Sequence, residues 1–507
     1  MAPSSSSNRS SDKSRKADDD DFVVVASAVR SASTKASTTA SEGSSVKKRK
    51  TDDHLGSKTQ SLFPLFNKKM SATVDPEASS SSSDPQQGAF VWLAPLGPSS
   101  RPSCLRASLG RPLQEQVERR KGVQGQEKVK VACFDLDGCL VVPRNGKSFP
   151  SATDEYDFEE TRWGVFKRVK EEYQKGACIA IVSNQKQTSP QSTALTPSSR
   201  LKTWKSKLAH IAHAIDCPML VLAALSDDGF RKPGRAMWDK GIVDAYVEVG
   251  GQREDIEVTP GGQVQDEVSY FVGDAAGRPQ DHNDTDRKWA TNVGIPFYTP
   301  EEFFDGKRPQ QYKITGWKPP ADLVSTVGED IVSKTLLPSD KTKPDIVVFV
   351  GPPASGKTSY FRRHFQPHGY AWVNQDKLKT AAKCQQAVKD YLQQGESVVI
   401  DNTNRNVTTR APYIAIAKEL GAQVRCVHFD VVKDLAWHNN LFRARAGLQN
   451  EEDARSLVPK LAFDSYYANL EAPKRSEGFD ADIVLVPWAF DAEADAETKR
   501  RWLCLWD

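Results

Sequence analysis

Two stretches of the chain alternate short hydrophobic runs with longer segments of mixed polarity. In the first stretch, the runs VKVACF, ACIAIVS, MLVLAA and YFVGD begin at residues 129, 177, 219 and 270. In the second, DIVVFV begins at residue 345, and shorter runs cover 370–373, 397–400, 424–429 and 483–486. Short hydrophobic runs separated by helix-length segments are typical of buried parallel strands joined by right-handed crossovers. The pattern therefore predicts the α/β fold class, with two parallel-sheet domains.

The remaining segments set the expected domain boundaries. Residues 1–87 are dominated by Ser, Thr, Lys and Asp. Such a segment buries too little hydrophobic surface to offset the entropy lost on folding, so we expect a disordered tail. We expect residues 88–128 to pack on the surface of the first domain as a lead-in segment. The first domain then covers 129–305, a linker rich in Pro and Lys covers 306–343, and the second domain covers 344–507.

Composition excludes several classes of site. Lys and Arg total 69 against 66 Asp and Glu, a formal net charge of +3, so binding of nucleic acid has to rely on a local basic surface. The eight cysteines form no Cys-x-x-Cys pair and several lie in hydrophobic runs, which indicates a reducing compartment without a structural zinc site. The sequence shows no hydrophobic run long enough for a membrane span and no secretory signal.

The run that begins at residue 345 leads directly into a glycine-rich loop. Residues 351–358, GPPASGKT, match the phosphate-loop pattern G-x-x-x-x-G-K-[ST] between an expected strand and an expected helix. Backbone amides of such a loop, here around Gly351, Ser355 and Gly356, cradle the phosphates of a nucleotide. Lys357 would reach the β- and γ-phosphates, and Thr358 would hold Mg²⁺. We therefore expect the second domain to bind ATP with Mg²⁺.

Polar residues at later strand ends are candidates for handling the phosphate acceptor. Asp376 follows the run at 370–373 and could accept a proton from an attacking hydroxyl, or alternatively cap the N-terminus of a helix. Three residues after the run at 397–400 could orient the acceptor or the water shell of the metal, or simply form a turn: Asp401, Asn402 and Asn404. Arg443 and, as a second choice, Arg445 could close over the γ-phosphate, although arginines are otherwise surface residues.

The first run of the first domain ends in two aspartates one residue apart. In a strand, Asp135 and Asp137 would share a face at the carboxyl end of the sheet, and Gly138 would let the chain turn away. The alternative is an ordinary strand with polar residues at its turn. Paired carboxylates at a strand end suit hydrolysis of a phosphate ester. Asp135 would attack phosphorus, and Asp137 would protonate the leaving alkoxide and then activate water.

Other strand ends of the first domain supply groups that such a reaction needs. Ser183 and Asn184 end the second run, and Lys232 lies in GFRKPG after the third. These residues would bind the phosphoryl oxygens. Asp274 ends the last run and would hold Mg²⁺ together with the Asp-x-Asp pair. Without Lys232, the carboxylates and an incoming phosphate would repel one another.

The motifs FDLDGCL, IVSNQ, FRKPG and VGDAAGRP resemble the four motifs of the haloacid-dehalogenase-like phosphatases. With PFYTPEEFF, GPPASGKT, VNQDKL, DNTNRN, HNNLFR and EAPKRSEGF, they make residues 129 to about 490 resemble the eukaryotic polynucleotide kinase 3′-phosphatase family. This resemblance implies a Rossmannoid phosphatase followed by a P-loop kinase, with Mg²⁺ in both sites and ATP in the kinase. It also implies action on DNA nicks, gaps and double-strand breaks. The metal carboxylate that follows Asp274 could be Asp281 or Asp286, and the motif DRKWATNVG makes Asp286 the more natural counterpart.

The sequence departs from that family at several positions. Ser183 stands where threonine is usual and keeps the hydroxyl, and Cys139 also stands where threonine is common. Gln375 and Leu441 replace arginines, which puts the grip on the acceptor and the kinase rate in doubt. The polar tail cannot fold the forkhead-associated domain that the animal enzymes carry, so we do not expect recruitment through phosphorylated scaffolds.

Two short segments of the expected tail are candidates for a nuclear-import signal and for a peptide that docks on a partner protein. Residues 47–50, KKRK, would suit a nuclear-import signal or a phosphate-contacting tail, and a solvated charge run is the alternative. Residues 60–66, QSLFPLF, gather bulky hydrophobic groups as a docking peptide would. They loosely resemble the sliding-clamp-binding box, although Asn67 stands where the second aromatic belongs.

We therefore expect a monomeric nuclear enzyme that processes both kinds of DNA end in strand-break repair. One alternative is a kinase-phosphatase that heals RNA ends. Another is a 3′-phosphatase, or a scaffold for strand breaks, whose kinase half has decayed. Transfer of labelled phosphate from ATP to a 5′-hydroxyl end separates the last alternative from the others.

Overall fold

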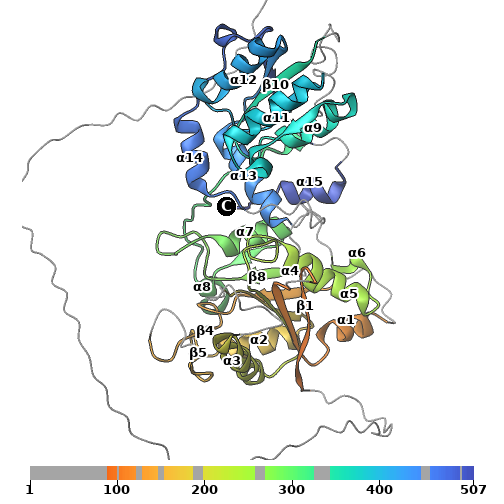
Figure 1. The fold of residues 1–507 in the computed structure, drawn as a ribbon. Helices are drawn as coiled ribbons and strands as arrows, with labels where there is room; N and C mark the ends of the chain where they lie inside the picture. The colour runs from red at the N-terminus through yellow and green to blue at the C-terminus, as the bar shows by residue number, and fades with distance from the viewer. Residues whose placement is uncertain are drawn as a thin grey trace, which may run out of the picture. The chain divides into compact units, whose positions relative to one another are not determined.

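The structure is a computed structural model that describes residues 88–99, 102–121, 128–146, 153–185, 198–256, 269–324, 343–446, 457–490 and 494–507. These residues belong to one compact unit, Ser81–Asp507, and most of them fold around two separate α/β sheets (Figure 1). The tail expected at 1–87, with its basic run at 47–50 and its clamp-like segment at 60–66, lies outside the described residues.

The first sheet has seven strands in the order β1-β2-β7-β6-β3-β8-β9. Their bounds are, in that order, Phe90–Leu96, Cys104–Leu109, Met219–Ala224, Cys178–Asn184, Val131–Phe134, Tyr270–Val272 and Phe297–Tyr298. The strands from β7 to β9 are parallel to one another. The four predicted runs of the first domain are therefore β3, β6, β7 and β8, and the predicted parallel sheet is confirmed. A short hairpin of β4 (Val141–Val142) and β5 (Glu159–Glu160) stands apart from it.

Helices cover both faces of the first sheet. They are α1 (Pro112–Arg120), α2 (Val165–Gln174), α3 (Ser199–Ile215), α4 (Ala236–Trp238), the π-helix η1 (Asp239–Asp244), α5 (Ala245–Glu248), α6 (Arg253–Ile256), α7 (Thr285–Val293) and α8 (Pro300–Asp305). Cys133 of β3 packs in one core with Trp238 and Trp289. Its neighbour Phe134 packs in a second core with residues of α2 and α3. Successive strand residues point to opposite faces, so β3 is buried on both sides.

Residues 88–128 correct our expectation of a surface lead-in. Strand β2 pairs antiparallel with β7, from Cys104 opposite Ala224 to Leu109 opposite Met219, and β1 then pairs antiparallel with β2. Strands β1 and β2 therefore form an integral edge of the first sheet. An outer strand buries less of its surface than a central strand, so its sequence can keep the polar and proline residues that suggested a surface segment.

The second sheet has five parallel strands in the order β11-β12-β10-β13-β14. Their bounds are, in that order, Ala371–Val373, Val398–Ile400, Asp345–Val350, Gln423–Phe429 and Val484–Val486. The helices are α9 (Lys357–His364), α10 (Gln375–Leu378), α11 (Ala381–Gln393), α12 (Val407–Leu420), α13 (Lys433–Arg445), α14 (Lys460–Ala468) and α15 (Ala496–Trp502), with 3₁₀ turns at Gln366–His368 and Arg475–Glu477. All five predicted runs of the second domain are strands. The strand order reverses at β10, which is where parallel sheets bind ligands.

The described part of the expected linker, residues 306–324 and 343, contacts both halves of the chain. The amide of Lys313 donates to the carbonyl of Gly277 in the first domain. The amide of Gly277 in turn donates to the carbonyl of Asn283. Trp317 packs against the core of the second domain. A 3₁₀ turn follows at Ala321–Val324.

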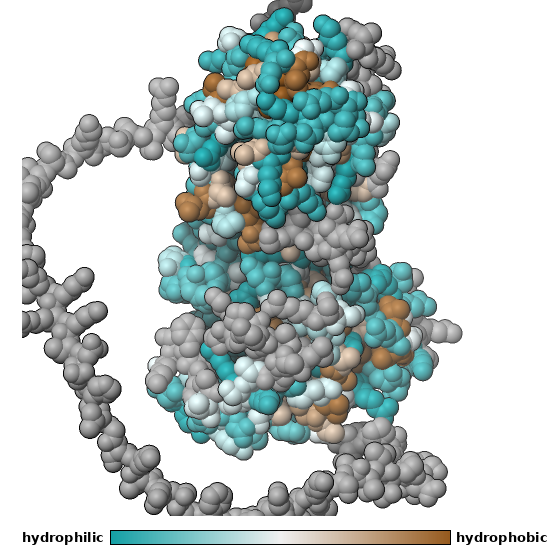
Figure 2. Space-filling view, viewed as in Figure 1, coloured by the Kyte–Doolittle hydropathy of each residue, from teal (hydrophilic) through white to brown (hydrophobic). Residues whose placement is uncertain are grey.

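Hydrophobic residues on the described surface occur in small groups among polar ones on the face that Figure 2 shows. Within the described ranges, none of the helices has both the length and the apolar character that crossing a membrane requires. All eight cysteines are buried and unpaired.

Candidate active sites

The first candidate site begins where β3 ends. The strand stops at Phe134, and the buried Asp135 follows, with its amide donating to the carbonyl of Val272 in β8 at 2.8 Å. The chain then turns at Gly138, where φ is 84° and an added Cβ would lie 2.4 Å from Oδ2 of Asp274. Only glycine allows that approach. Because the strand has already ended, strand alternation does not orient Asp137, contrary to our prediction.

Three carboxylates and one lysine converge beside this turn. Carboxylate oxygens of Asp135, Asp274 and Asp286 lie within 4.8 Å of one another. The Nζ of Lys232 lies 2.5 Å from Oδ1 of Asp135 and 2.8 Å from Oδ1 of Asp286. It also donates to the carbonyl of Val182 at 2.9 Å. Four chain segments that are far apart in sequence therefore meet at the carboxyl end of the parallel strands.

Burial and mutual charge set the protonation of this cluster. Burial, with the charges of Asp286 and Asp274, raises the pKa of Asp135 despite the opposing effect of Lys232. Burial and the charge of Asp286 raise the pKa of Asp274 to about 6. Burial alone would lower the pKa of Lys232, but Asp135 and Asp286 more than compensate, so that pKa is raised. Lys232 is therefore a fixed positive charge at neutral pH, suited to an anionic phosphate.

The charge and donor types of the cluster fit a divalent metal ion. With the three carboxylates ionised, three negative charges and one positive charge leave a net charge of −2. Oxygen-only donors are those that Mg²⁺ prefers. The structure favours Asp286 over Asp281 for this set, because the guanidinium of Arg278 binds both carboxylate oxygens of Asp281 at 3.1 and 2.9 Å.

The remaining predicted residues of the first site lie beside the cluster. One oxygen of Asp137 accepts from Nε2 of Gln185 at 2.7 Å, and the same nitrogen lies 2.9 Å from the hydroxyl of Ser183. The carboxylate of Asp137 is not among the three that converge, and its assignment as a metal ligand stays a prediction. Asn184 exchanges two hydrogen bonds with the backbone of Lys232, at 2.8 and 3.0 Å. It therefore holds the backbone of that lysine, and its contact with a phosphate stays a prediction.

Gln185 is a site residue that the sequence analysis did not propose. It joins Asp137 to Ser183 and so fixes the relative position of two candidate site groups. Its position directly after Ser183 and Asn184 at the end of β6 was the available signal.

The second candidate site is the loop between β10 and α9. Ala354 and Gly356 have φ values of 60° and 91°, which turn the loop back on itself. The Nζ of Lys357 donates to the carbonyls of Gly351 and Pro352 at 3.0 and 2.6 Å, and lies 3.2 Å from the hydroxyl of Ser355. The loop thus has the curled backbone that a phosphate-binding loop needs.

Thr358 and Asp401 place a hydroxyl and a carboxylate together at the same end of the sheet. The Thr358 hydroxyl donates to Oδ2 of Asp401 at 2.7 Å, and the indole of Trp372 donates to the same oxygen at 3.0 Å. Asp401 follows β12, the neighbour of β10, and is buried. A hydroxyl paired with a carboxylate beside a phosphate loop fits the metal of a bound nucleotide triphosphate.

The other residues after β11 and β12 separate into structural and accessible ones. Asn404 is buried and donates from Nδ2 to the carbonyl of Phe349 at 2.8 Å. It therefore ties the loop after β12 to β10, and its nucleotide contact stays a prediction. Asn402 accepts from the amide of Gln375 at 2.7 Å. Asn374 caps α10, so the alternative of a helix cap at Asp376 is wrong, and Asp376 is exposed in the first turn.

The two predicted arginines lie near the end of α13. Arg443 donates from Nη2 to Oδ1 of Asn440 at 3.2 Å. Arg445 instead pairs with Asp227 of the first domain at 3.1 Å and donates to the carbonyl of Trp506. The helix contacts the phosphate loop through another residue, Asn439, whose Nδ2 lies 3.3 Å from the carbonyl of Ala354.

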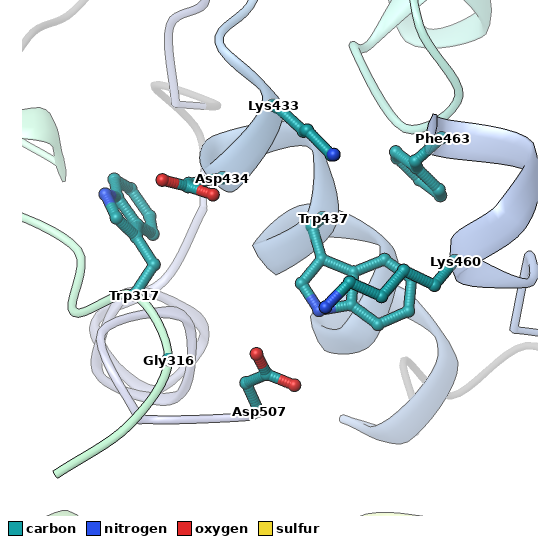
Figure 3. A pocket seen from close by; sticks show the side chains of 8 residues that line it. All are labelled: Gly316, Trp317, Lys433, Asp434, Trp437, Lys460, Phe463 and Asp507. Atoms are coloured by element: carbon teal, nitrogen blue, oxygen red, sulfur yellow. The ribbon is translucent and has the colours of Figure 1, made fainter. Parts of the chain in front are cut away.

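A separate pocket of about 230 Å³ opens beside the start of α13 and α14 (Figure 3). None of the predicted site residues lines it. Its lining consists of Gly316, Trp317, Lys433, Asp434, Trp437, Lys460, Phe463 and Asp507.

Comparison with known proteins decides the family. The family model described as "Polynucleotide kinase 3 phosphatase" matches residues 130–304, and the family model described as "AAA domain" matches residues 346–473. A bifunctional polynucleotide phosphatase/kinase of Schizosaccharomyces pombe is 34% identical over 361 residues, which are 71% of this chain and 80% of that protein. The chain belongs to the bifunctional polynucleotide phosphatase/kinase family. A protein of Acanthamoeba polyphaga mimivirus is 30% identical over 412 residues, 74% of this chain and 89% of that protein.

As a bifunctional polynucleotide phosphatase/kinase, the chain combines a polynucleotide 3′-phosphatase with a polynucleotide 5′-hydroxyl kinase. The predicted family and the predicted pair of activities are confirmed. The carboxylate cluster lies in the half that matches the phosphatase description, and the phosphate loop lies in the other half.

Proposed function

We propose that this bifunctional polynucleotide phosphatase/kinase acts on DNA ends in strand-break repair, with Mg²⁺ in both sites and ATP in the kinase. The observation that carries this proposal is the presence on one chain of a carboxylate cluster around Lys232 and a phosphate loop backed by Asp401. The pair of activities restores ends for ligation, because ligation needs a 3′-hydroxyl beside a 5′-phosphate.

In the phosphatase, Asp135 attacks the phosphorus of the 3′-phosphate, and the bond between phosphorus and the 3′-oxygen breaks. Asp137, held by Gln185, protonates that oxygen as it leaves. Asp137 then takes a proton from water, which attacks the aspartyl phosphate and releases inorganic phosphate and Asp135. Lys232 and Ser183 neutralise and orient the phosphoryl oxygens throughout. A Mg²⁺ ion on Asp135, Asp274 and Asp286 would supply further charge neutralisation.

In the kinase, Lys357 and the loop amides hold the phosphates of ATP, and Thr358 with Asp401 would hold its Mg²⁺. Asp376 takes the proton of the 5′-hydroxyl as its oxygen forms a bond to the γ-phosphorus and the bond to ADP breaks. The exposed position of Asp376 supports this role, because a polynucleotide end has to reach it. Arg443 is proposed to meet the γ-phosphate.

The choice of DNA over RNA is tested with matched substrates. A nicked DNA duplex with a 3′-phosphate and a 5′-hydroxyl is compared with an RNA duplex that is nicked at the same place and carries the same ends. We expect higher kcat/KM for both activities on the nicked DNA. Faster processing of the RNA would support an RNA-end-healing enzyme instead, and absence of transfer from labelled ATP to either 5′-hydroxyl would support a decayed kinase half.

Nuclear localisation is proposed from the basic run at 47–50. The full chain with a fluorescent tag should enter the nucleus, and replacement of all four basic residues by alanine should leave it in the cytoplasm. Unchanged nuclear entry of that variant would remove the support for this segment. A clamp or scaffold partner bound through residues 60–66 is proposed on the hydrophobic character of that segment alone.

A further inference from the structure

The last six residues of the chain, 502–507, form a C-terminal segment that is buried against both catalytic domains. Trp502, Cys504, Leu505 and Trp506 are each exposed by 4% or less. The segment begins at the last residue of α15 in the kinase domain, and its hydrogen bonds reach into the phosphatase domain.

Asn292 of the phosphatase domain joins this C-terminal segment to the loop that carries Lys232. Its Nδ2 donates to the carbonyls of Pro233 at 2.8 Å and Leu505 at 2.9 Å. Its Oδ1 accepts from the amide of Leu505 at 2.8 Å. Pro233 directly follows Lys232, so one side chain connects the segment to the residue beside the phosphatase lysine.

The helix that carries Asn292 also carries a carboxylate of the cluster. Asp286 lies in the first turn of α7 and Asn292 in its last turn. Between them, the Nζ of Lys288 donates to the carbonyl of Asp507 at 2.6 Å and pairs with Asp284 at 2.8 Å. The C-terminal segment therefore contacts α7, which carries Asp286, through Lys288 and Asn292. Through Asn292 it is also connected to Pro233, the residue after Lys232.

Close packing keeps the end of the segment in place. A Cβ added at Gly316 would lie 2.8 Å from the Cβ of Asp507. Figure 3 shows the side chain of Asp507 beside Gly316, at the edge of the pocket that Trp437 and Lys460 also line. The loop before Lys232 is held as well, because Arg445 bonds to both Asp227 and the carbonyl of Trp506.

The opposite end of the segment contacts the kinase. The indole of Trp502 donates to Oδ1 of Asn439 at 2.8 Å, and Asn439 in turn contacts the phosphate loop at Ala354. The carbonyl of Trp502 lies 2.7 Å from Nε2 of His438. The C-terminal segment that contacts Asn292 is thus held at its other end by residues of the kinase domain.

We propose that Asn292 is a positioning residue of the 3′-phosphatase, and that the C-terminal segment is the support against which it places Lys232. Lys232 has to lie between Asp135 and Asp286 with its Nζ aimed at the phosphoryl oxygens. The hydrogen bond from Asn292 to Pro233 fixes the backbone one residue away, and Leu505 fixes the amide of Asn292. A small displacement of a group that binds the reacting phosphate costs rate without removing any catalytic atom.

Two substitutions at Asn292 test this proposal. Asn292→Asp keeps the shape and the acceptor for the amide of Leu505, but loses the donor to the carbonyls of Pro233 and Leu505. Asn292→Ala loses all three bonds. We expect phosphatase kcat on a 3′-phosphorylated oligonucleotide to fall about tenfold for both variants, with KM changed less than twofold and kinase kcat unchanged. Hydrogen exchange at the amides of 229–236 should rise in both variants, while that of β10 stays as in the wild type.

The matched control is Asn440→Ala in the kinase domain. Asn440 is also buried and bridges two backbone groups of another segment, the carbonyl and the amide of Val458, at 2.9 and 3.2 Å. It should lower the midpoint of thermal unfolding to a similar extent and leave phosphatase kcat unchanged. An equal loss of phosphatase kcat in Asn440→Ala would assign the effect to general destabilisation and overturn the proposal.

Failure of the proposal and failure of the function are distinguishable. Unchanged phosphatase kcat in Asn292→Asp and Asn292→Ala, with an active wild type, would overturn the positioning role and leave the function standing. An inactive wild type on the same oligonucleotide would contradict the function itself.

Discussion

The phosphatase site and the kinase site differ in how each holds its central lysine. Lys232 is buried and contacts carboxylates from the end of β3 and from α7, which are far away in sequence. The contacts of Lys357 described above are with Gly351, Pro352 and Ser355 of its own loop. The position of Lys232 therefore depends on the packing of distant segments and on the C-terminal segment, whereas the contacts named here for Lys357 lie within its own loop.

Asp135→Asn should give the largest single effect. The amide removes the nucleophile, so phosphatase kcat should fall by about 10⁴-fold or more. Kinase kcat should stay within twofold of the wild type, since Asp135 lies outside the kinase domain. Both rates are measured on separate 3′-phosphate and 5′-hydroxyl oligonucleotides, and a parallel loss of kinase activity would show that the two sites are not separate.

Lys357→Met should lower kinase kcat by about 10³-fold, because it removes the charge that binds the β- and γ-phosphates. Phosphatase activity should not change. The assay is transfer of labelled phosphate from ATP to a 5′-hydroxyl oligonucleotide. Retention of more than a tenth of the wild-type rate would mean that this lysine does not bind the triphosphate.

The same substitution at the two lysines sharpens the comparison of their surroundings. Lys232→Met leaves the carboxylates of Asp135 and Asp286 buried without their partner, so we expect the free energy of unfolding to fall by about 3 kcal/mol. Lys357→Met removes hydrogen bonds to backbone carbonyls of a loop, and we expect a loss of about 1 kcal/mol. Denaturation with urea measures both. Equal losses would contradict the difference in how the two lysines are held.

Acid should weaken the kinase half through His438. Burial lowers the pKa of His438 from 6.5 to about 4. The unfolded chain therefore binds a proton at a higher pH than the folded one, and stability from the neutral imidazole is present above pH 6.5 and is lost as pH falls toward 4.

His438→Gln keeps a donor for the carbonyl of Trp502 but cannot titrate. The stability advantage of the wild type over this variant should shrink by about 2 kcal/mol between pH 7 and pH 5, as measured by urea denaturation at each pH. An advantage that does not change with pH would show that His438 titrates normally in the fold.

Much of the fold and part of each site could be predicted, because the hydrophobic runs and the motifs are continuous in sequence. The phosphate loop and Asp135 are examples: each follows directly from the strand before it. Thr358 and Asp401 were both predicted, yet their pairing came from the sheet order, in which β12 lies beside β10.

The parts that could not be predicted depend on contacts between distant segments. The roles of Asn184 and Asn404 in holding backbone groups became visible only with the partner atoms in place. Strand β2 is recognisable as part of the sheet only through β7, 111 residues away at Ser108 and Met219. Asn292 lies inside the motif DRKWATNVG, but its partners, Pro233 and Leu505, are distant in sequence and could not be inferred from that motif.

The most direct test of two separate active sites on one chain is complementation on a single nick. A nicked DNA duplex with a 3′-phosphate and a 5′-hydroxyl is incubated with ATP and DNA ligase, and sealing is measured. Wild type should allow sealing, Asp135→Asn or Lys357→Met alone should not, and a mixture of the two variants should restore it. Sealing with either variant alone, or no sealing with an active mixture of both, would contradict the assignment of the two activities to these two sites.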